Sequence, residues 1–181
     1  MRVDLEALLP LIEGSELHKR FQRIAELEKY TLLTPPYAGD AVKELFGRAQ
    51  TELGTRLSTE YYWFLKCCDG GLLFTNHLFS LLAPDDEDDD LVSVNLFLRE
   101  EQMIPEGSAA IGETNYGGYI VQCESGKKAM GIWDPSEETY VARYEDLYDW
   151  LDDMLQEAHY LLEHGGLFEI EDDPEDTESG H

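Results

Sequence analysis

The sequence predicts an α+β fold in which an antiparallel sheet of about five to six strands is flanked by helices. Three observations lead to this prediction. Apolar residues recur at helical spacing in the first part of the chain and again near its end. Between these parts, short apolar runs alternate with turn residues, which is typical of antiparallel strands. The chain has 181 residues, 43% of them hydrophobic, which is enough to bury one core.

The first part of the chain predicts three helical stretches. Apolar side chains indicate a short helix within residues 5–12, and a second apolar stripe covers residues 17–27. The sequence TPPYAGD then interrupts the helical pattern. Asp40 is a candidate N-cap for a third helix, which Gly54 is expected to close.

A fourth helix is predicted to run into the sequence YYWFLKCCDGG, residues 61–71. Ser58 is its candidate N-cap because a serine hydroxyl can accept from an N–H group of the first turn. Phe64 and Leu65 lie on the apolar face, so we expect both to be buried against the sheet. We interpret the glycine pair as the helix end, with Gly70 in the left-handed conformation.

Six apolar runs bounded by turn residues predict the strands of the sheet. Between the second and third runs, residues 91–102 fit either a helix or an extended segment, and we favour the helix. The runs are LLF (72–74), LFSLL (78–82), AAIG (109–112), YIVQC (119–123), MGIW (130–133) and TYVARY (139–144).

A long helix and an acidic tail end the chain. The helix over residues 145–160 carries an apolar stripe on one side and acidic residues on the other. The tail has few apolar anchors, so we expect it to be disordered and, from about Glu169, dispensable for folding. The predicted organisation is an N-terminal helical segment packed on the domain (1–33), the α+β domain (34–164) and the tail (165–181).

The formal net charge of −26 limits the partners of this protein. A nucleic-acid-binding protein needs a cationic face to displace counterions, and this surface repels phosphate and anionic lipid alike. We therefore expect a basic protein partner, no nucleic acid and no membrane. Acidity that serves only solubility is the alternative interpretation.

The sequence contains no recognisable catalytic, cofactor or metal site. Cys67 and Cys68 are neighbours on a predicted helix and point about 100° apart, so they cannot share a metal ion, and we expect Cys68 in the core and Cys67 at its periphery. The acidic run is not an EF-hand, because such a loop starting at Asp86 needs glycine where Leu91 stands. We expect no enzymatic activity and no cofactor.

Localisation is expected to be cytoplasmic. No stretch approaches the about 20 apolar residues that span a bilayer. The start MRVDLEALLPLIEG carries acidic residues where a secretory signal is basic and then apolar. Three cysteines, an odd number without a CxxC motif, do not indicate a disulfide framework. We expect a monomer or a weak homodimer.

Several motifs, taken in order, resemble the SUKH superfamily, which includes yeast cell-wall-assembly regulators and bacterial toxin-immunity proteins. The resemblance covers about residues 34–160 and differs from the family pattern at Ser58, Asp69 and Tyr119, where proline, asparagine and aspartate are usual. Serine and aspartate suit the same backbone, whereas Tyr119 removes a carboxylate. The motifs are ELG, LSTEY (57–61), FLKCCDGG, IGETNYGGYIVQ (111–122) and GIWDPSEE (131–138).

The resemblance implies an interaction module without a catalytic centre. The resemblance implies an immunity protein that binds a basic toxin, such as a nuclease, and the alternative is an intracellular regulatory scaffold for a cellular client. Opposite charge accelerates such association. The candidate partner-binding surface is the acidic run, the polar face of the last helix, or both: Asp85, Asp86, Glu87, Asp88, Asp89, Asp90, Asp149, Asp152, Asp153 and Glu157.

Overall fold

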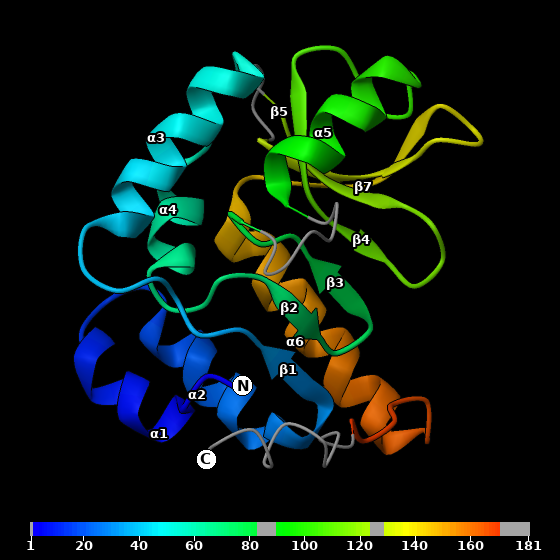
Figure 1. The fold of residues 1–181 in the computed structure, drawn as a ribbon. Helices are drawn as coiled ribbons and strands as arrows, with labels where there is room; N and C mark the ends of the chain where they lie inside the picture. The colour runs from blue at the N-terminus through cyan, green and yellow to red at the C-terminus, as the bar shows by residue number, and fades with distance from the viewer. Residues whose placement is uncertain (1, 83–89, 124–128, 171–181) are drawn as a thin grey trace, which may run out of the picture.

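The computed structural model describes residues 2–82, 90–123 and 129–170, and it confirms the α+β fold (Figure 1). The strands form one antiparallel sheet in which the order of the strands follows the sequence. Within the described residues there are seven strands rather than five or six: β1 Thr31–Leu33, β2 Gly71–Leu73, β3 Asn76–Leu78, β4 Ser108–Thr114, β5 Tyr119–Cys123, β6 Met130–Asp134 and β7 Thr139–Tyr144.

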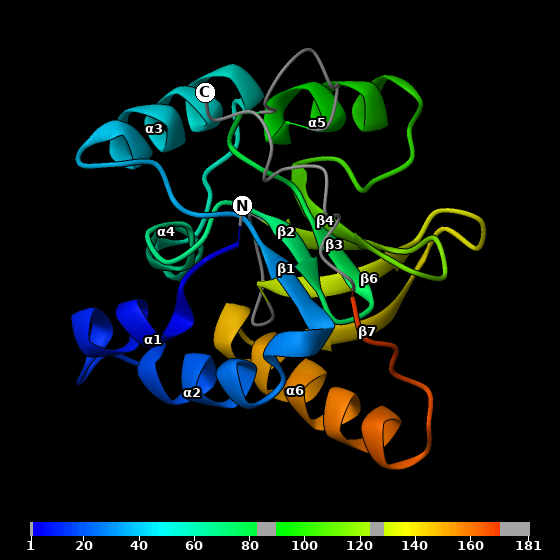
Figure 2. The same cartoon turned by 60° about the horizontal axis from the view of Figure 1, so that its bottom comes forward.

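Helices lie on both sides of this sheet (Figure 2). Helix α6 contacts β6 and β7 on one face, and α2 packs beside it, whereas α5 contacts β4 and α3 packs beside α5. In the described part of the chain the α-helices are α1 Leu5–Leu8, α2 His18–Glu26, α3 Ala41–Leu53, α4 Thr59–Leu65, α5 Leu91–Glu100 and α6 Leu147–Glu163, with 3-10 turns η1 Leu9–Ile12 and η2 Glu28–Tyr30. No helix among these is long and apolar enough to cross a membrane.

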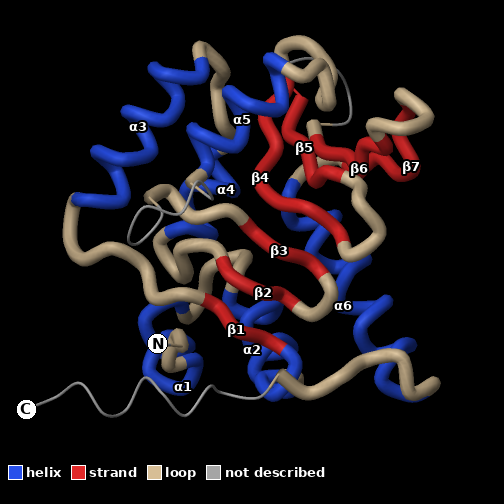
Figure 3. Tube along the Cα trace, turned by 45° about the vertical axis from the view of Figure 1, so that its right-hand side comes forward, coloured by secondary structure: helices blue, strands red, loops and turns tan. Residues whose placement is uncertain are grey.

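The additional strand is β1, which the sequence did not reveal. It has only three residues and pairs with β2 through Thr31 opposite Leu73 and Leu33 opposite Gly71. A segment this short shows no periodicity, so only its partner strand defines it. Figure 3 shows β1, β2 and β3 side by side at this end of the sheet.

The strand at the second apolar run differs from the sequence prediction. The sequence predicts a strand over residues 78–82, but β3 spans Asn76–Leu78. The reason is the tight connection between β2 and β3, in which Phe74 has a φ of 59° and only two residues separate the strands. A two-residue hairpin fixes the register of both strands from the turn outward, so the pairing ends at Leu78 opposite Gly71.

Four of the described helices begin at a residue whose side chain accepts an N-cap hydrogen bond. Ser58 accepts a hydrogen bond from the N–H of Tyr61, as expected, and Asp146 accepts one from the N–H of Asp149. Residues 91–100 form the favoured helix, which Asp90 caps, and Asp4 caps α1. Asp40 occupies the N-cap position of α3, but its carboxylate makes no cap hydrogen bond because its backbone is already helical.

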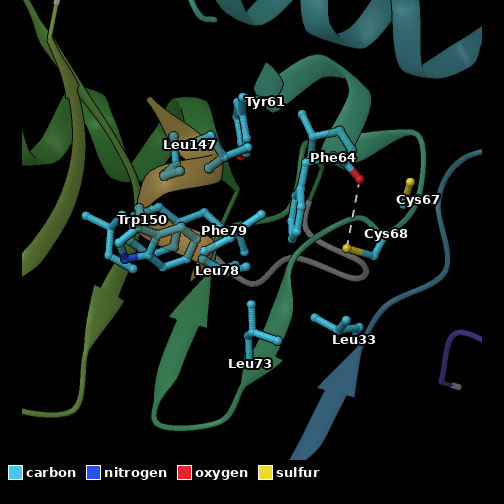
Figure 4. Close-up of a cluster of buried hydrophobic side chains, with 14 of the residues drawn as sticks. Leu33, Tyr61, Phe64, Cys67, Cys68, Leu73, Leu78, Phe79, Leu147 and Trp150 are labelled. Carbon is cyan, nitrogen blue, oxygen red and sulfur yellow. Dashed lines mark hydrogen bonds between the residues drawn. The ribbon is translucent and has the colours of Figure 1, made fainter. Parts of the chain in front are cut away.

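The core forms where α4 meets the sheet and α6 (Figure 4). Phe64 and Leu65 are 1% and 0% exposed, which confirms the predicted burial. Phe64 lies near Leu73 and Leu78 of the sheet, and its ring is 5.9 Å from that of Phe21 in α2. Aromatic side chains contribute large apolar areas to such a core.

The glycine pair has a different role from the one predicted. Helix α4 ends at Leu65, several residues before Gly70, so these glycines do not cap it. Gly70 does have the predicted left-handed backbone, with a φ of 75°. The structure requires glycine for close approach: a Cβ on Gly71 would lie 2.2 Å from the carbonyl oxygen of Leu32, and one on Gly70 would lie 2.7 Å from that of Leu78.

The last described residues of the chain, 169 and 170, contact residues near the N-terminus. The N–H of Ile170 donates to the carbonyl of Lys29 at 2.8 Å, and its own carbonyl accepts from Arg2 at 2.9 Å. Lys29 also lies 3.5 Å from the carboxylate of Glu169. The rest of the predicted disordered tail, residues 171–181, lies outside the described residues.

Candidate protein-interaction surface

Of the acidic run at residues 85–90, only Asp90 lies within the described residues. Asp85, Asp86, Glu87, Asp88 and Asp89 lie outside the described residues. Asp90 is described, and its carboxylate serves the fold. One oxygen accepts from the N–H groups of Val92 and Ser93 at 2.9 and 3.0 Å, and the other accepts from the Ser93 hydroxyl at 2.6 Å. Asp90 is therefore the N-cap of α5.

Three of the predicted site residues form one line along α6. Asp149, Asp153 and Glu157 follow one another at four-residue spacing, which places them one above the other on the helix surface, and all three are exposed. We call these three residues the acidic stripe. No lysine or arginine within the described ranges forms an ion pair with them. Like charges at this spacing oppose helix formation slightly, so the repulsion among these three carboxylates does not stabilise α6.

The fourth predicted residue on α6, Asp152, is used differently. Its carboxylate accepts from the guanidinium of Arg20 at 2.6 Å and lies 3.8 Å from that of Arg23. Both arginines belong to α2, so this contact joins α2 to α6. Asp152 lies about 60° around the helix from Asp149 and about 100° from Asp153, so it borders the acidic stripe on the side where Arg20 and Arg23 of α2 approach.

Tyrosines flank the acidic stripe, and the sequence did not identify them. The hydroxyl of Tyr144, at the end of β7, donates to Asp153 at 2.8 Å. Partial burial and this carboxylate raise the pKa of Tyr144. Tyr116 lies in the β4–β5 turn. Partial burial raises its pKa, the hydrogen bond with Thr114 lowers it, and the charges of Glu157 and Asp134 raise it by smaller amounts.

The flanking tyrosines give the surface an aromatic component. Tyr116 is 64% exposed. Tyrosine is enriched in protein interfaces because it offers apolar area and a hydrogen-bonding hydroxyl with few rotatable bonds. The arrangement can therefore do two things: attract a cationic surface over a distance and contact it through aromatic rings.

The two adjacent cysteines are not a reactive centre. Cys68 is in the core as expected, but Cys67 is also buried, at 2% exposure, which corrects the peripheral position predicted for it. Cys67 lines an apolar groove together with Leu8 and Leu17 of the N-terminal segment, whose position sequence periodicity does not give. Burial raises the pKa of Cys67 to about 12 and that of Cys68 well above its ordinary value. Each thiol donates to a helix carbonyl, Cys68 to that of Phe64 (Figure 4). Such thiols stay protonated and unreactive.

Asp69 is the carboxylate that departs most from ordinary behaviour. It is 2% exposed, and burial raises its pKa to about 6 although the hydrogen bond from the N–H of Leu81 lowers it. This bond and the one from the Ser80 hydroxyl to the Asp69 carbonyl hold two loops together. Across the described chain, no group of three or more histidine, cysteine or acidic side chains is placed to hold a metal ion.

Comparison with known proteins identifies one family. The family model described as the SMI1 / KNR4 family (SUKH-1) matches residues 42–153, which is more than half of the chain. The matched span runs from α3 into α6 and includes Asp149, Asp152 and Asp153. The N-terminal helices α1 and α2 and the C-terminal part of α6 lie outside it. No curated protein matches the sequence.

Proposed function

Because the chain belongs to the SMI1 / KNR4 family (SUKH-1), we propose that it is a non-catalytic module that binds a basic protein, and that it acts as an immunity protein neutralising a bacterial toxin. The observation that carries this proposal is the acidic stripe. Three exposed carboxylates stand in line on one helix without an ion-pair partner in the described structure. A basic toxin surface supplies the missing cations.

The charge of the whole molecule supports the same proposal. A net charge of −26 produces a field that attracts a basic partner before contact and increases the rate of association. A toxin that acts on nucleic acid has a cationic channel, and an acidic protein can occupy this channel in place of phosphates. We include the acidic run Asp85–Asp89, which lies outside the described residues, in the proposed surface on the ground of its charge.

The alternative function is an intracellular regulatory scaffold, and the family description, which carries the name of the SMI1 / KNR4 regulators, favours it as a second candidate. Both functions use a protein-binding surface and neither needs a catalytic group. The identity of the partner separates them. A toxin domain supports the immunity function, whereas a cellular client protein supports the scaffold.

Association kinetics test the proposal once cross-linking and mass spectrometry in the source cells have identified the partner. We expect the association rate to fall about tenfold between low and high salt, because screening limits electrostatic attraction to about 8–10 Å near physiological ionic strength. The triple variant Asp149→Asn, Asp153→Asn, Glu157→Gln is expected to associate more slowly, with a weaker dependence on salt.

The matched control removes the same charge elsewhere. Glu44, Glu100 and Glu101 are exposed carboxylates on α3 and at the end of α5, far from the stripe in sequence. Changing these three to glutamine alters the net charge equally but leaves the stripe intact. Equal slowing by both triple variants, or an association rate that salt does not change, contradicts the proposed role of the stripe.

A further inference from the structure

An apolar groove on the opposite side of α4 from the sheet is not part of the acidic stripe. It has a volume of about 570 Å³ and lies between the N-terminal turns and α4. The buried side chains of Leu8, Leu17 and Cys67 form its floor. Two large apolar side chains stand exposed at its sides: Leu11 of η1 is 82% exposed, and Trp63 of α4 is 52% exposed.

These two side chains stand together at one groove. A leucine and a tryptophan exposed to this extent keep apolar area in contact with water, and burying that area against a partner is favourable. The Trp63 ring is held in place by an edge contact with Tyr62 at 5.3 Å. Tryptophan beside a desolvated pocket is typical of the residues that carry most of the binding energy in protein interfaces.

Carboxylates surround the groove. Glu13 and Glu16 line it. Tyr148 of α6 also lines the groove, and partial burial raises its pKa, with Glu60, Asp146 and Glu16 acting in the same direction and Arg20 in the opposite one.

The cations near the groove already have partners. Lys66 donates to the carbonyl of Gly39 at 3.1 Å. Arg20 pairs with Asp152 at 2.6 Å, lies 3.6 Å from Glu16 and covers the Tyr148 ring. Because a carbonyl is neutral, Lys66 keeps its positive charge, against the two carboxylates of Glu13 and Glu16 that line the groove. The lining therefore remains net negative around an apolar floor.

We propose that this groove binds an amphipathic basic segment of the protein partner, which places a large apolar side chain between Leu11 and Trp63 and lysine or arginine against the surrounding carboxylates. The inference rests on the proposed protein-binding function. Apolar anchoring into a groove between helices is a recurring mode of peptide recognition. One wall of the groove consists of residues 8–17, which precede the span matched by the family, so the groove adds a contact that the matched domain alone does not contain.

Binding of synthetic peptides tests the groove without the natural partner. The probe is a labelled helical peptide of about four turns built from leucine and lysine. Two comparison peptides replace lysine by glutamate or leucine by serine. We expect the leucine–lysine peptide to bind at least about tenfold more tightly than either, because only it supplies both an anchor and positive charge.

Substitutions at the exposed wall residues locate the binding. Leu11→Ser and Trp63→Ser are expected to weaken binding of the leucine–lysine peptide by about tenfold or more. Both side chains are largely exposed, so circular dichroism should show an intact fold. The matched control is Phe97→Ser on α5, an equally exposed aromatic position at 56%, which should change the affinity by less than about twofold.

Each other outcome overturns the inference. Equal affinity for the leucine–lysine and serine–lysine peptides, or unchanged binding in both wall variants, shows that charge alone attracts the peptide and that the groove is not a docking site. A concentration-dependent dimer in analytical ultracentrifugation that Leu11→Ser abolishes identifies a second copy as the occupant and also overturns it. These results leave the salt dependence at the acidic stripe untouched, so failure of the groove and failure of the proposed function are distinguishable.

Discussion

Acidic residues on adjoining surfaces of helix α6 have different roles. Toward α2, Asp152 is paired with Arg20 and Arg23 and joins two helices. On the adjoining surface, Asp149, Asp153 and Glu157 have no ion-pair partner among the described residues and accept only local hydrogen bonds where they accept any. An acidic residue of α6 is therefore structural where the fold places a cation opposite it, and available for binding a partner where it does not.

The same division extends to two aspartates away from α6. Asp69 is buried and holds a loop, and Asp90 caps α5, so both belong with Asp152. We call Asp69, Asp90 and Asp152 the structural group. Substitutions in the structural group should change the stability of the protein, and substitutions in the acidic stripe should change binding of the partner.

The largest effect is expected at Asp69. Asp69→Asn should raise the free energy of unfolding at pH 7 by about 1–3 kcal/mol, since asparagine keeps an acceptor for Leu81 without a buried charge. The pKa of Asp69 is about 6 in the folded protein, above its ordinary value of 3.8. The folded state therefore binds a proton more readily than the unfolded state. The ionised carboxylate destabilises the protein increasingly from about pH 4 and fully above about pH 6.

The pH dependence gives the sign of the Asp69 effect. The stabilising effect of Asp69→Asn should be full at pH 7 and disappear as the pH falls from about 6 to about 4, where the wild-type carboxyl is protonated. Denaturant unfolding of both proteins at each pH measures the difference, which removes the contribution of the other carboxylates. A variant less stable than wild type at pH 7 contradicts the assignment.

Asp90→Ala should lower the free energy of unfolding by about 1–2 kcal/mol, because α5 loses the acceptor of two N–H groups. Asp40→Ala is the matched control, since Asp40 stands at the N-cap of α3 without a cap hydrogen bond. We expect the control to change stability by less than about 0.5 kcal/mol. Equal losses in urea unfolding are incompatible with this difference between the two caps.

Breaking the contact between α2 and α6 should have a smaller effect. Asp152→Asn is expected to cost about 0.5–1 kcal/mol, because the carboxylate is partly exposed and water screens its attraction to Arg20. The control is Asp153→Asn on the same helix. The double-mutant cycle with Arg20→Gln isolates the pair, and a coupling energy of zero removes Asp152 from the structural group.

The smallest effect on stability is expected at the acidic stripe. Changing Asp149, Asp153 and Glu157 together to their amides should leave the free energy of unfolding unchanged or raise it by a few tenths of a kcal/mol, about 0.5 at most, because repulsion between neighbouring carboxylates is removed. Thermal unfolding measures this change. A clear loss of stability would show that the stripe stabilises the fold, which contradicts its proposed role as a binding surface.

The position of several elements followed from the sequence because the signals were local. Ser58 caps α4, and Phe64 and Leu65 lie on its apolar face. Both features depend on neighbours within one or two turns, so capping chemistry and periodicity predicted them correctly. Residues 91–100 formed the favoured helix for the same reason. The motif order was sufficient to indicate the family, which the match to residues 42–153 confirms.

Elements defined by distant partners were missed. Strand β1 exists because β2 lies beside it, and the close approach of Gly71 to Leu32 became visible only once those strands were paired. Tyr144 and Tyr116 reach the acidic stripe from strands and turns that precede α6 in the sequence. No spacing rule connects these residues, so sequence analysis found the carboxylates of the site but not its aromatic side chains.

The sequence by itself determined that this protein is acidic and has an α+β core, because composition and local apolar patterns need no knowledge of long-range contacts. The order of its motifs also indicated the SUKH family, to which the matched span of residues 42–153 belongs. Only the tertiary structure decided which acidic residues remain available. Asp152 and Arg20 are 132 residues apart in the sequence, yet the fold brings them to 2.6 Å, whereas Asp153 one position later faces outward. An ion pair forms where two charges meet within a few ångströms, and that distance is a property of the packed helices, not of the spacing along the chain.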